Sequence, residues 1–258
     1  MASWSNLRAR TANRLARHLC AAPMQLESGQ PMVSFTFDDI PMSAATVGAP
    51  MLEEVGGRGT FYIAGGLVNQ PNNHCEGIDH DGIIKLHRSG HEIACHTFSH
   101  RRAIDLDAAA MAAEIAQNRH YLEGLDASIR LENFAYPYGL ATVARKRQLT
   151  TSFRSARGIL PGVNSSTIDL QFLRSTPLID KDIDRDGVDR IFDEAVATKG
   201  WLIFYTHDVA DTPSPWGCTP GLLRHALDAA RRRNMPVVSV AEALRRAGGQ
   251  AAFGGAPT

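Results

Sequence analysis

The chain has 258 residues, and 44% of them are apolar, which is typical of a folded globular domain and excludes a disordered or fibrous protein. Lys plus Arg and Asp plus Glu are balanced at 27 each, so no net field attracts nucleic acid or an anionic membrane. The cysteines form no CxxC pair, and we expect free thiols at all four positions: Cys20, Cys75, Cys95 and Cys218.

The two ends of the chain differ in pattern from the region between them. Residues 5–20 alternate Leu and Ala with Arg at helical spacing, and we expect residues 1–30 to form an amphipathic helical extension that covers the domain. Peripheral membrane contact through residues 5–20 is less favoured, because the apolar face is thin and lacks aromatic side chains. No apolar run is long enough for a signal peptide or a transmembrane helix, so we expect a cytoplasmic protein. Residues 248–258 are predicted to be a flexible tail.

Strand-like and helical segments alternate through residues 31–247, which we expect to form a single domain. In chain order, strands are predicted at residues 32–37, 59–64, 92–94, 133–137, 151–154, 172–175, 201–206 and 236–240. Helices are predicted at residues 44–55, 79–89, 107–122, 186–198 and 219–233. This alternation predicts an α/β fold with a parallel sheet, either open or closed into a barrel.

Polar side chains stand where several of these strands end. Asp38 and Asp39 follow the first strand, His96 and His100 follow the third, and His207 ends the strand at residues 201–206. Because ligands collect at the carboxyl ends of parallel strands, we expect these distant segments to meet on one face.

The chemistry of these side chains suggests a hydrolytic metal centre. One carboxylate and two imidazoles make a three-ligand site with open positions for water and substrate. The second carboxylate is then free to take a proton from water, and a further histidine could protonate a departing nitrogen. Each motif alone has a plainer explanation: Asp38-Asp39 also fits a solvated turn, and His96 with His100 also fits a structural pair.

Taken together, four motifs resemble the ordered motifs of the polysaccharide deacetylases, which are carbohydrate esterases with a NodB-homology domain. They are Thr36–Asp39 (TFDD), Gly90–His100 (GHEIACHTFSH), Phe134–Gly139 (FAYPYG) and Phe204–Asp208 (FYTHD). The resemblance extends from about Met32 to Val240. It implies that residues 31–247 are a catalytic domain with a distorted (β/α) barrel of seven or eight strands.

The resemblance also implies roles for individual residues. A divalent metal, zinc or alternatively cobalt, nickel or iron, would be bound by three side chains: Asp39, His96 and His100. Asp38 would be the general base, His207 the general acid, and the backbone N–H of Tyr138 would stabilise the oxyanion. The implied reaction removes an acetyl group from an N-acetylated sugar or polysaccharide precursor.

The sequence departs from the family pattern at two places. Ile40 and Pro41 follow the Asp pair, where the family usually has Gly. Ala135 stands where the family often has an Arg that pairs with the base Asp, and three other arginines could supply that charge: Arg154, Arg157 and Arg174. A carbohydrate-binding homologue without activity and a related amide or cyclic-imide hydrolase therefore remain as alternatives.

Aromatic residues near the expected site are candidates for sugar contact. Trp216 lies in the Pro-rich segment after His207, which is either a rigid loop or a wall on which a sugar ring stacks. Tyr136 and Pro137 are further substrate candidates, although aromatic residues more often serve packing.

Overall fold

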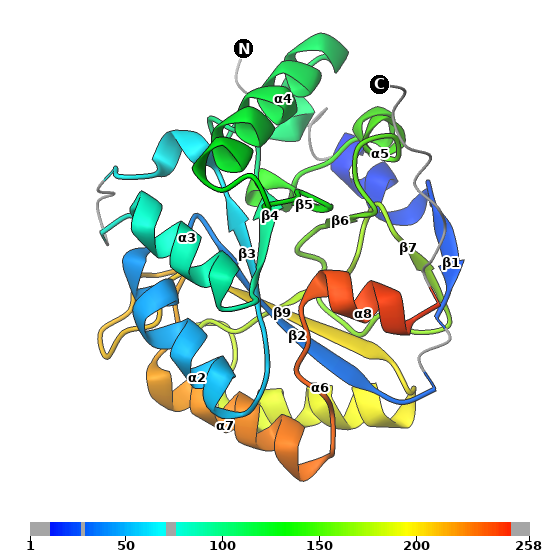
Figure 1. Cartoon of the computed structure of the whole chain (residues 1–258). Helices are drawn as coiled ribbons and strands as arrows, with labels where there is room; N and C mark the ends of the chain where they lie inside the picture. Colours follow the sequence, from blue (N-terminus) through cyan, green and yellow to red (C-terminus); the bar gives the residue numbers. More distant parts are fainter. Residues whose placement is uncertain (1–10, 27–28, 71–75, 249–258) are drawn as a thin grey trace.

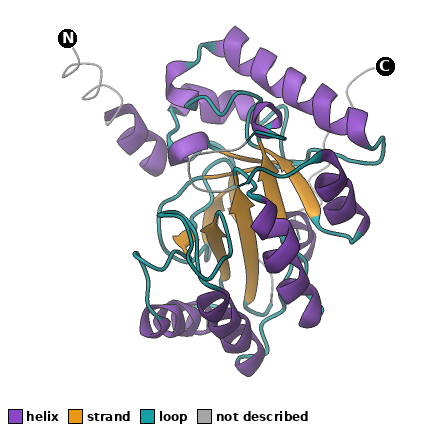
Figure 2. Cartoon of the chain, turned by 90° about the vertical axis from the view of Figure 1, so that its left-hand side faces the viewer, coloured by secondary structure: helices purple, strands orange, loops and turns teal. Residues whose placement is uncertain are grey.

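The computed structural model describes residues 11–26, 29–70 and 76–248. Its centre is a seven-stranded sheet in the order β6-β5-β4-β3-β2-β9-β8, and all neighbouring strands in it are parallel. Helices surround the curled sheet (Figure 1), and Figure 2 shows its strands running side by side between them. The arrangement is the distorted (β/α) barrel that the sequence predicted.

The two longest strands of this sheet are continuous apolar runs. β2 (Met32–Asp38) is buried along its whole length, and β9 (Trp201–Thr206) pairs with it in register from Met32–Trp201 to Phe37–Thr206. Such runs are typical of parallel strands that are covered on both faces. The other strands of this sheet are β3 (Thr60–Ile63), β4 (Glu92–Cys95), β5 (Asn133–Ala135), β6 (Ser155–Arg157) and β8 (Thr176–Pro177).

Side-chain caps define where many of the helices begin. Asp79, Asp107 and Asp184 each accept a hydrogen bond from the backbone N–H three residues further on, and Thr142, Thr219 and Ser239 do the same. The α-helices are α2 (Ala49–Glu54), α3 (His80–Arg88), α4 (Ala108–Leu125), α5 (Val143–Leu149), α6 (Arg185–Ala197), α7 (Pro220–Arg232) and α8 (Val240–Arg246). Shorter helical turns are η1 (Ala44–Gly48), η2 (Gly65–Leu67), η3 (Ala103–Asp105) and η4 (Pro137–Gly139).

Three strand predictions are wrong in position. Residues 151–154 form a turn, because α5 ends just before them and the N–H groups of Ser152 and Phe153 donate to the carbonyl of Leu149. β6 begins only after this turn, and β8 lies just beyond the predicted segment 172–175. Within residues 236–240 only Val237 forms a bridge, to Val33, because Ser239 caps α8 and turns the chain into a helix.

The N-terminal segment packs against the domain. Residues 11–18 are helical, and the buried ammonium of Lys146 donates to the carbonyls of Ala16 and Leu19 at 2.6 and 2.7 Å. The next residues form β1 (Pro23–Gln25), which pairs with β7 (Thr167–Asp169) in a separate antiparallel sheet. Residues 1–10 of the predicted extension and residues 249–258 of the predicted tail lie outside the described residues. None of the helices within the described ranges is long and apolar enough to cross a bilayer.

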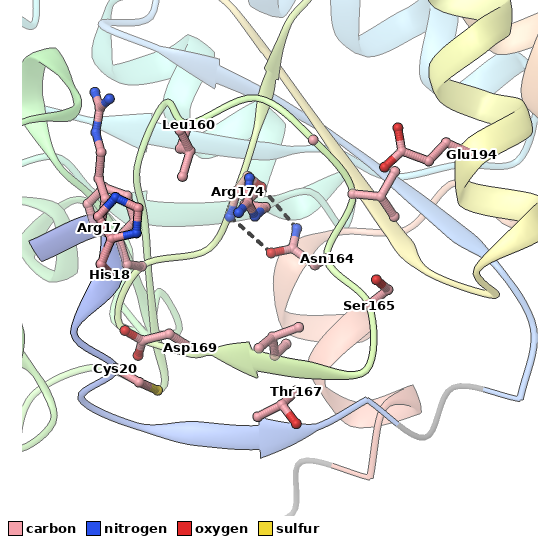
Figure 3. A pocket seen from close by; sticks show the side chains of 14 residues that line it. Arg17, His18, Cys20, Leu160, Asn164, Ser165, Thr167, Asp169, Arg174 and Glu194 are labelled. Carbon is pink, nitrogen blue, oxygen red and sulfur yellow. Dashed lines mark hydrogen bonds between the residues drawn. The ribbon is translucent and has the colours of Figure 1, made fainter. Parts of the chain in front are cut away.

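A cavity of about 560 Å³ lies between this N-terminal segment and the chain around residues 160–174 (Figure 3). Arg17 and His18 lie on one side of it, and Glu194 lies on the other. Arg174 is held in place because the Asn164 side chain bonds both its backbone N–H and its carbonyl at 2.9 Å. This cavity shares no lining residue with the site described below.

The cysteines that the structure describes are free thiols, as predicted. Cys95 and Cys218 are buried, and burial raises the pKa of each thiol. Cys20 is exposed, and Cys75 lies outside the described residues.

Candidate active site

The carboxyl ends of the strands meet around one cleft, as the sequence predicted. Asp38 is the last residue of β2, His96 follows β4, and His207 follows β9. Tyr138 lies in η4, directly after β5. The cleft has a volume of about 370 Å³ and is lined by Asp38, Asp39, His96, His100, Tyr136, Tyr138, Gly139, Ile159, Tyr205, His207 and Trp216.

Backbone strain is concentrated at this cleft. Nine non-glycine residues in the described chain have positive φ, and five of them belong to these strand ends: Asp39, Ile40, Thr97, His100 and Tyr138. Each such residue costs on the order of 1–3 kcal/mol, and for the β-branched Ile40 the conformation is a genuine outlier. Strain of this kind persists where the surrounding structure must hold a side chain in one place, so the cleft is a candidate functional site.

Three side chains in the cleft present possible metal ligands to one point. The Nε2 atoms of His100 and His96 lie 3.0 and 3.5 Å from Oδ1 of Asp39. All three ligand atoms lie within 4.8 Å of one another, and the described residues contain no other group of three such side chains this close. This is the set of residues that the sequence predicted.

The protonation of His96 suits a metal ligand. Its Nδ1–H donates to the backbone carbonyl of Ala135 at 2.8 Å, so the lone pair of Nε2 faces Asp39. Burial lowers the pKa of His96 to about 4, and the imidazole is therefore neutral near pH 7. A hydrogen bond from the second ring nitrogen to a carbonyl is the usual support of a metal-binding histidine.

Asp39 completes the donor set. Burial acts to raise the pKa of its carboxyl group, but the three neighbouring imidazoles outweigh this effect and hold that pKa below its ordinary range. Its Oδ1 is buried and makes no aligned hydrogen bond with any described group. A buried carboxylate oxygen without a hydrogen bond is costly, and a cation between it and the two imidazoles would remove that cost. The donors therefore fit a divalent metal.

Asp38 is paired with a buried arginine from another strand. Nη2 of Arg157 donates to Oδ1 of Asp38, and both side chains are buried. The Arg157 guanidinium lies over the rings of Tyr62 and Tyr205, at 4.9 and 5.4 Å from their centroids. Burial acts to lower the pKa of Arg157, but the Asp38 charge raises it. Arg157 on β6 thus supplies the positive charge beside Asp38 that Ala135 cannot supply.

The other two candidate arginines have different partners. Arg154 pairs with Glu132 at 3.0 Å, and Arg174 donates to the carbonyl of Pro161 at 3.0 Å. The question left open by the sequence is therefore resolved in favour of Arg157.

His207 is oriented by a backbone carbonyl. Its Nδ1 lies 3.1 Å from the carbonyl oxygen of Trp216, and its Nε2 lies 3.6 Å from Oδ2 of Asp39. The buried carboxylate of Asp208 points elsewhere: it accepts hydrogen bonds from the N–H and the hydroxyl of Ser214. The Ser214 hydroxyl oxygen in turn accepts from the N–H of Trp216 at 3.2 Å. Asp208 therefore fixes the loop that supplies the acceptor for His207.

The predicted substrate residues differ in accessibility. Trp216 and Tyr138 are 52% and 58% exposed at the edge of the cleft, and the ammonium of Lys181 lies 3.9 Å from the centroid of the Trp216 ring. Tyr136 lines the cleft but is buried, with its hydroxyl donating to the carbonyl of Gln171. Pro137 is buried and is not part of the lining.

The sequence assigned no role to three of the residues that line the cleft. Gly139 lies in the FAYPYG motif, and the other two are Ile159 and Tyr205. Tyr205 could have been found, because it lies two residues before His207 at the end of a predicted strand. Ile159 follows β6, and the sequence placed that strand too early.

A parallel (β/α) barrel with two imidazoles and a carboxylate at the carboxyl ends of its strands is an arrangement suited to a metal-dependent hydrolase. Comparison with known families narrows this class, because the family model described as polysaccharide deacetylase matches residues 25–152. The match includes Asp38, Asp39 and both metal-site histidines. The chain therefore carries a polysaccharide deacetylase domain of the NodB type.

Solved structures share this fold at low sequence identity. A T48 deacetylase with substrate has a TM-score of 0.60 at 17% identity, over 84% of this chain and 92% of that one. A family 4 acetyl xylan esterase from Clostridium thermocellum, in complex with a cobalt ion, has a TM-score of 0.57 at 20% identity, over 83% and 90%. BA3943 from Bacillus anthracis, described as a CE4 family pseudoenzyme, has a TM-score of 0.59 at 13% identity, over 84% and 66%. A search of curated proteins found no match.

Proposed function

We propose that this protein is a metal-dependent deacetylase that hydrolyses the acetamido group of an N-acetylated sugar. The observation that carries the proposal is the composition of one cleft. A metal-type donor set, a carboxylate paired with a buried arginine and an oriented histidine all line it. Metal-assisted hydrolysis of an unactivated amide uses a Lewis acid, a base for the attacking water and an acid for the departing amine.

The metal would be held by Asp39, His96 and His100. Two imidazoles and a carboxylate accept zinc, and also cobalt, nickel or iron. A cobalt ion in the related esterase structure agrees with such a site. When bound, the cation would polarise the acetyl carbonyl and make a nearby water more acidic.

The remaining residues of the cleft would move protons and stabilise charge. Asp38, held in position by Arg157, accepts a proton from the attacking water. The N–H of Tyr138 donates to the developing oxyanion. His207 then protonates the sugar nitrogen through Nε2 as the C–N bond breaks, which releases acetate and the free amine.

Two other functions are weaker alternatives. A related amide or cyclic-imide hydrolase without a metal is disfavoured because all three metal-type donors converge. The second alternative is a carbohydrate-binding homologue without activity; this fold includes a chain described as a pseudoenzyme, BA3943 from Bacillus anthracis. The lack of an arginine at position 135 favoured this inactive homologue, but Arg157 provides the ion pair with Asp38.

The test compares metal content and turnover in one series of variants. Asp38→Asn should bind the same amount of metal as the natural protein and release acetate from chitooligosaccharides or nucleotide-linked N-acetyl sugars about 10²–10⁴-fold more slowly. Asp81→Asn, an exposed carboxylate in the first turn of α3, is the matched control and should match the natural protein in both measurements. Full activity in Asp38→Asn would show that the base is assigned wrongly. Release of acetate only from O-acetylated sugars would replace the amide substrate by an ester.

A further inference from the structure

A second cavity, which is not the one shown in Figure 3, adjoins the active-site cleft. It has a volume of about 540 Å³ and is lined by His100, Arg101, Arg102, Asp105, Tyr138 and Leu140. His100 and Tyr138 line the cleft as well. A sugar held with its acetamido group beside His100 would therefore extend its remaining substituents into this second cavity.

The charge of the second cavity is unbalanced. Arg101 and Arg102 are both exposed. Nε of Arg102 donates to Oδ2 of Asp105 at 2.6 Å, so these two charges offset each other. Arg101 has no hydrogen-bond or ion-pair partner within the described part of the chain. One formal positive charge, on Arg101, is left to face the cavity.

The backbone from which Arg101 extends is held firmly. Oε2 of the buried Glu114 accepts hydrogen bonds from the N–H groups of Phe98 and Ser99 at 3.0 and 2.7 Å. His100, the next residue, has a φ of 52° and presents its imidazole to Asp39. The position of Arg101 relative to the metal-type donors is therefore fixed by the same loop that positions His100.

The cavity is also lined by an aromatic side chain, Tyr138. The Tyr138 ring stands 4.7 Å from the His100 ring between centroids and is 58% exposed. A cavity lined by both an exposed aromatic side chain and a guanidinium suits a sugar ring that carries a charged substituent.

We infer that this cavity is an anion subsite, in which Arg101 binds a phosphate or carboxylate group carried by the N-acetylated substrate. The inference rests on the proposed deacetylase function and names its substrate class. A guanidinium binds either anion through two charge-assisted N–H bonds in a fixed geometry. An anionic sugar would therefore be preferred over its neutral counterpart.

The test uses three matched monosaccharides with the metal-loaded protein. N-acetylglucosamine is neutral, its 6-phosphate carries a phosphate, and N-acetylmuramic acid carries a carboxylate. The natural protein should have a kcat/KM for at least one anionic sugar that exceeds the neutral value roughly tenfold or more. Arg101→Met should reduce this ratio about tenfold, chiefly through KM. Arg190→Met, an exposed arginine on α6, should leave the ratio unchanged. A preference for the phosphate-bearing or the carboxylate-bearing sugar shows which anionic group the natural substrate carries.

The failures of the two proposals are distinguishable. If all three sugars release acetate and the ratio is the same in the natural protein and in Arg101→Met, the anion subsite is wrong while the deacetylase stands. If no sugar releases acetate, calorimetric binding of N-acetylglucosamine 6-phosphate decides. Binding that Arg101→Met weakens about tenfold supports the subsite, and equal binding in both proteins overturns it.

Discussion

The buried pair of Arg157 and Asp38 allows a quantitative prediction. Arg157 is fully buried, Asp38 is 5% exposed, and the guanidinium donates directly to the carboxylate. Removing one partner of such a pair leaves an uncompensated charge and costs about 3–5 kcal/mol. We expect Arg157→Met to lose this amount of unfolding free energy, which corresponds to a fall in Tm of roughly 6–20 °C in a domain of this size. Misplacement of Asp38 should also reduce kcat roughly 10²-fold.

A double-mutant cycle separates pairing from packing. The variant with both Arg157→Met and Asp38→Asn carries neither charge, so it should recover most of the lost stability without regaining activity. Arg174→Met is the matched control, because Arg174 is exposed, and should change stability by less than about 0.5 kcal/mol. Stability is measured by denaturant unfolding and activity by acetate release. Normal stability and turnover in Arg157→Met, or no recovery in the double variant, would refute the pairing argument.

Two further predictions concern stability. Lys146→Met removes the ammonium that donates to the carbonyls of Ala16 and Leu19 and pairs with Asp169. We expect the unfolding free energy to fall by about 3 kcal/mol and trypsin to cleave the N-terminal segment faster. Unchanged cleavage would contradict this anchoring role. Burial lowers the pKa of His91 below its ordinary value of 6.5. As the pH falls below 6.5, the unfolded chain therefore binds a proton at His91 before the folded chain does. The unfolding free energy should fall on acidification for this reason. His91→Asn should show a shallower decline between pH 7 and 5 in denaturant titrations, and an equal slope would show that His91 is not responsible.

The sequence predicted the two longest strands and the longer helices because their patterns are local. β2 and β9 are continuous apolar runs. The start of α4 follows from its cap, Asp107, and α7 has both a cap, Thr219, and an apolar face. β6 has no such pattern: it consists of Ser, Ala and Arg, and its arginine is buried only because Asp38 lies opposite. A strand stabilised by a distant charge cannot be seen in a window of sequence.

Two helices escaped prediction for different reasons. α5 (VARKRQL) carries several charged side chains, including the buried Lys146, and two of its partners, the carbonyls of Ala16 and Leu19, lie more than a hundred residues away. α8 did carry a recognisable signal. Ser239 and Glu242 have the spacing of a capping box, and the Ser239 hydroxyl oxygen does accept from the Glu242 N–H. The β-branched run before it favoured a strand instead.

The expected site residues could be gathered from the sequence because strand ends in a parallel sheet share one edge. The groups that hold these side chains in position could not be predicted in this way. The carbonyl of Ala135 behind His96 and the carbonyl of Trp216 behind His207 are backbone groups, which any residue type would supply. Arg157 was one of three arginines that sequence alone could not separate, since the choice depends on which strand lies near Asp38 in space.

The central claim is that Asp39, His96 and His100 bind a single divalent cation. The most direct measurement is calorimetric titration of the metal-free protein with Co²⁺, accompanied by the absorption spectrum of the bound ion. We predict one ion per chain in the natural protein and loss of that binding in His100→Gln, with His87→Gln on the exposed surface of α3 as the unaffected control. The absence of stoichiometric binding in the natural protein, or undiminished binding in His100→Gln, would contradict the account.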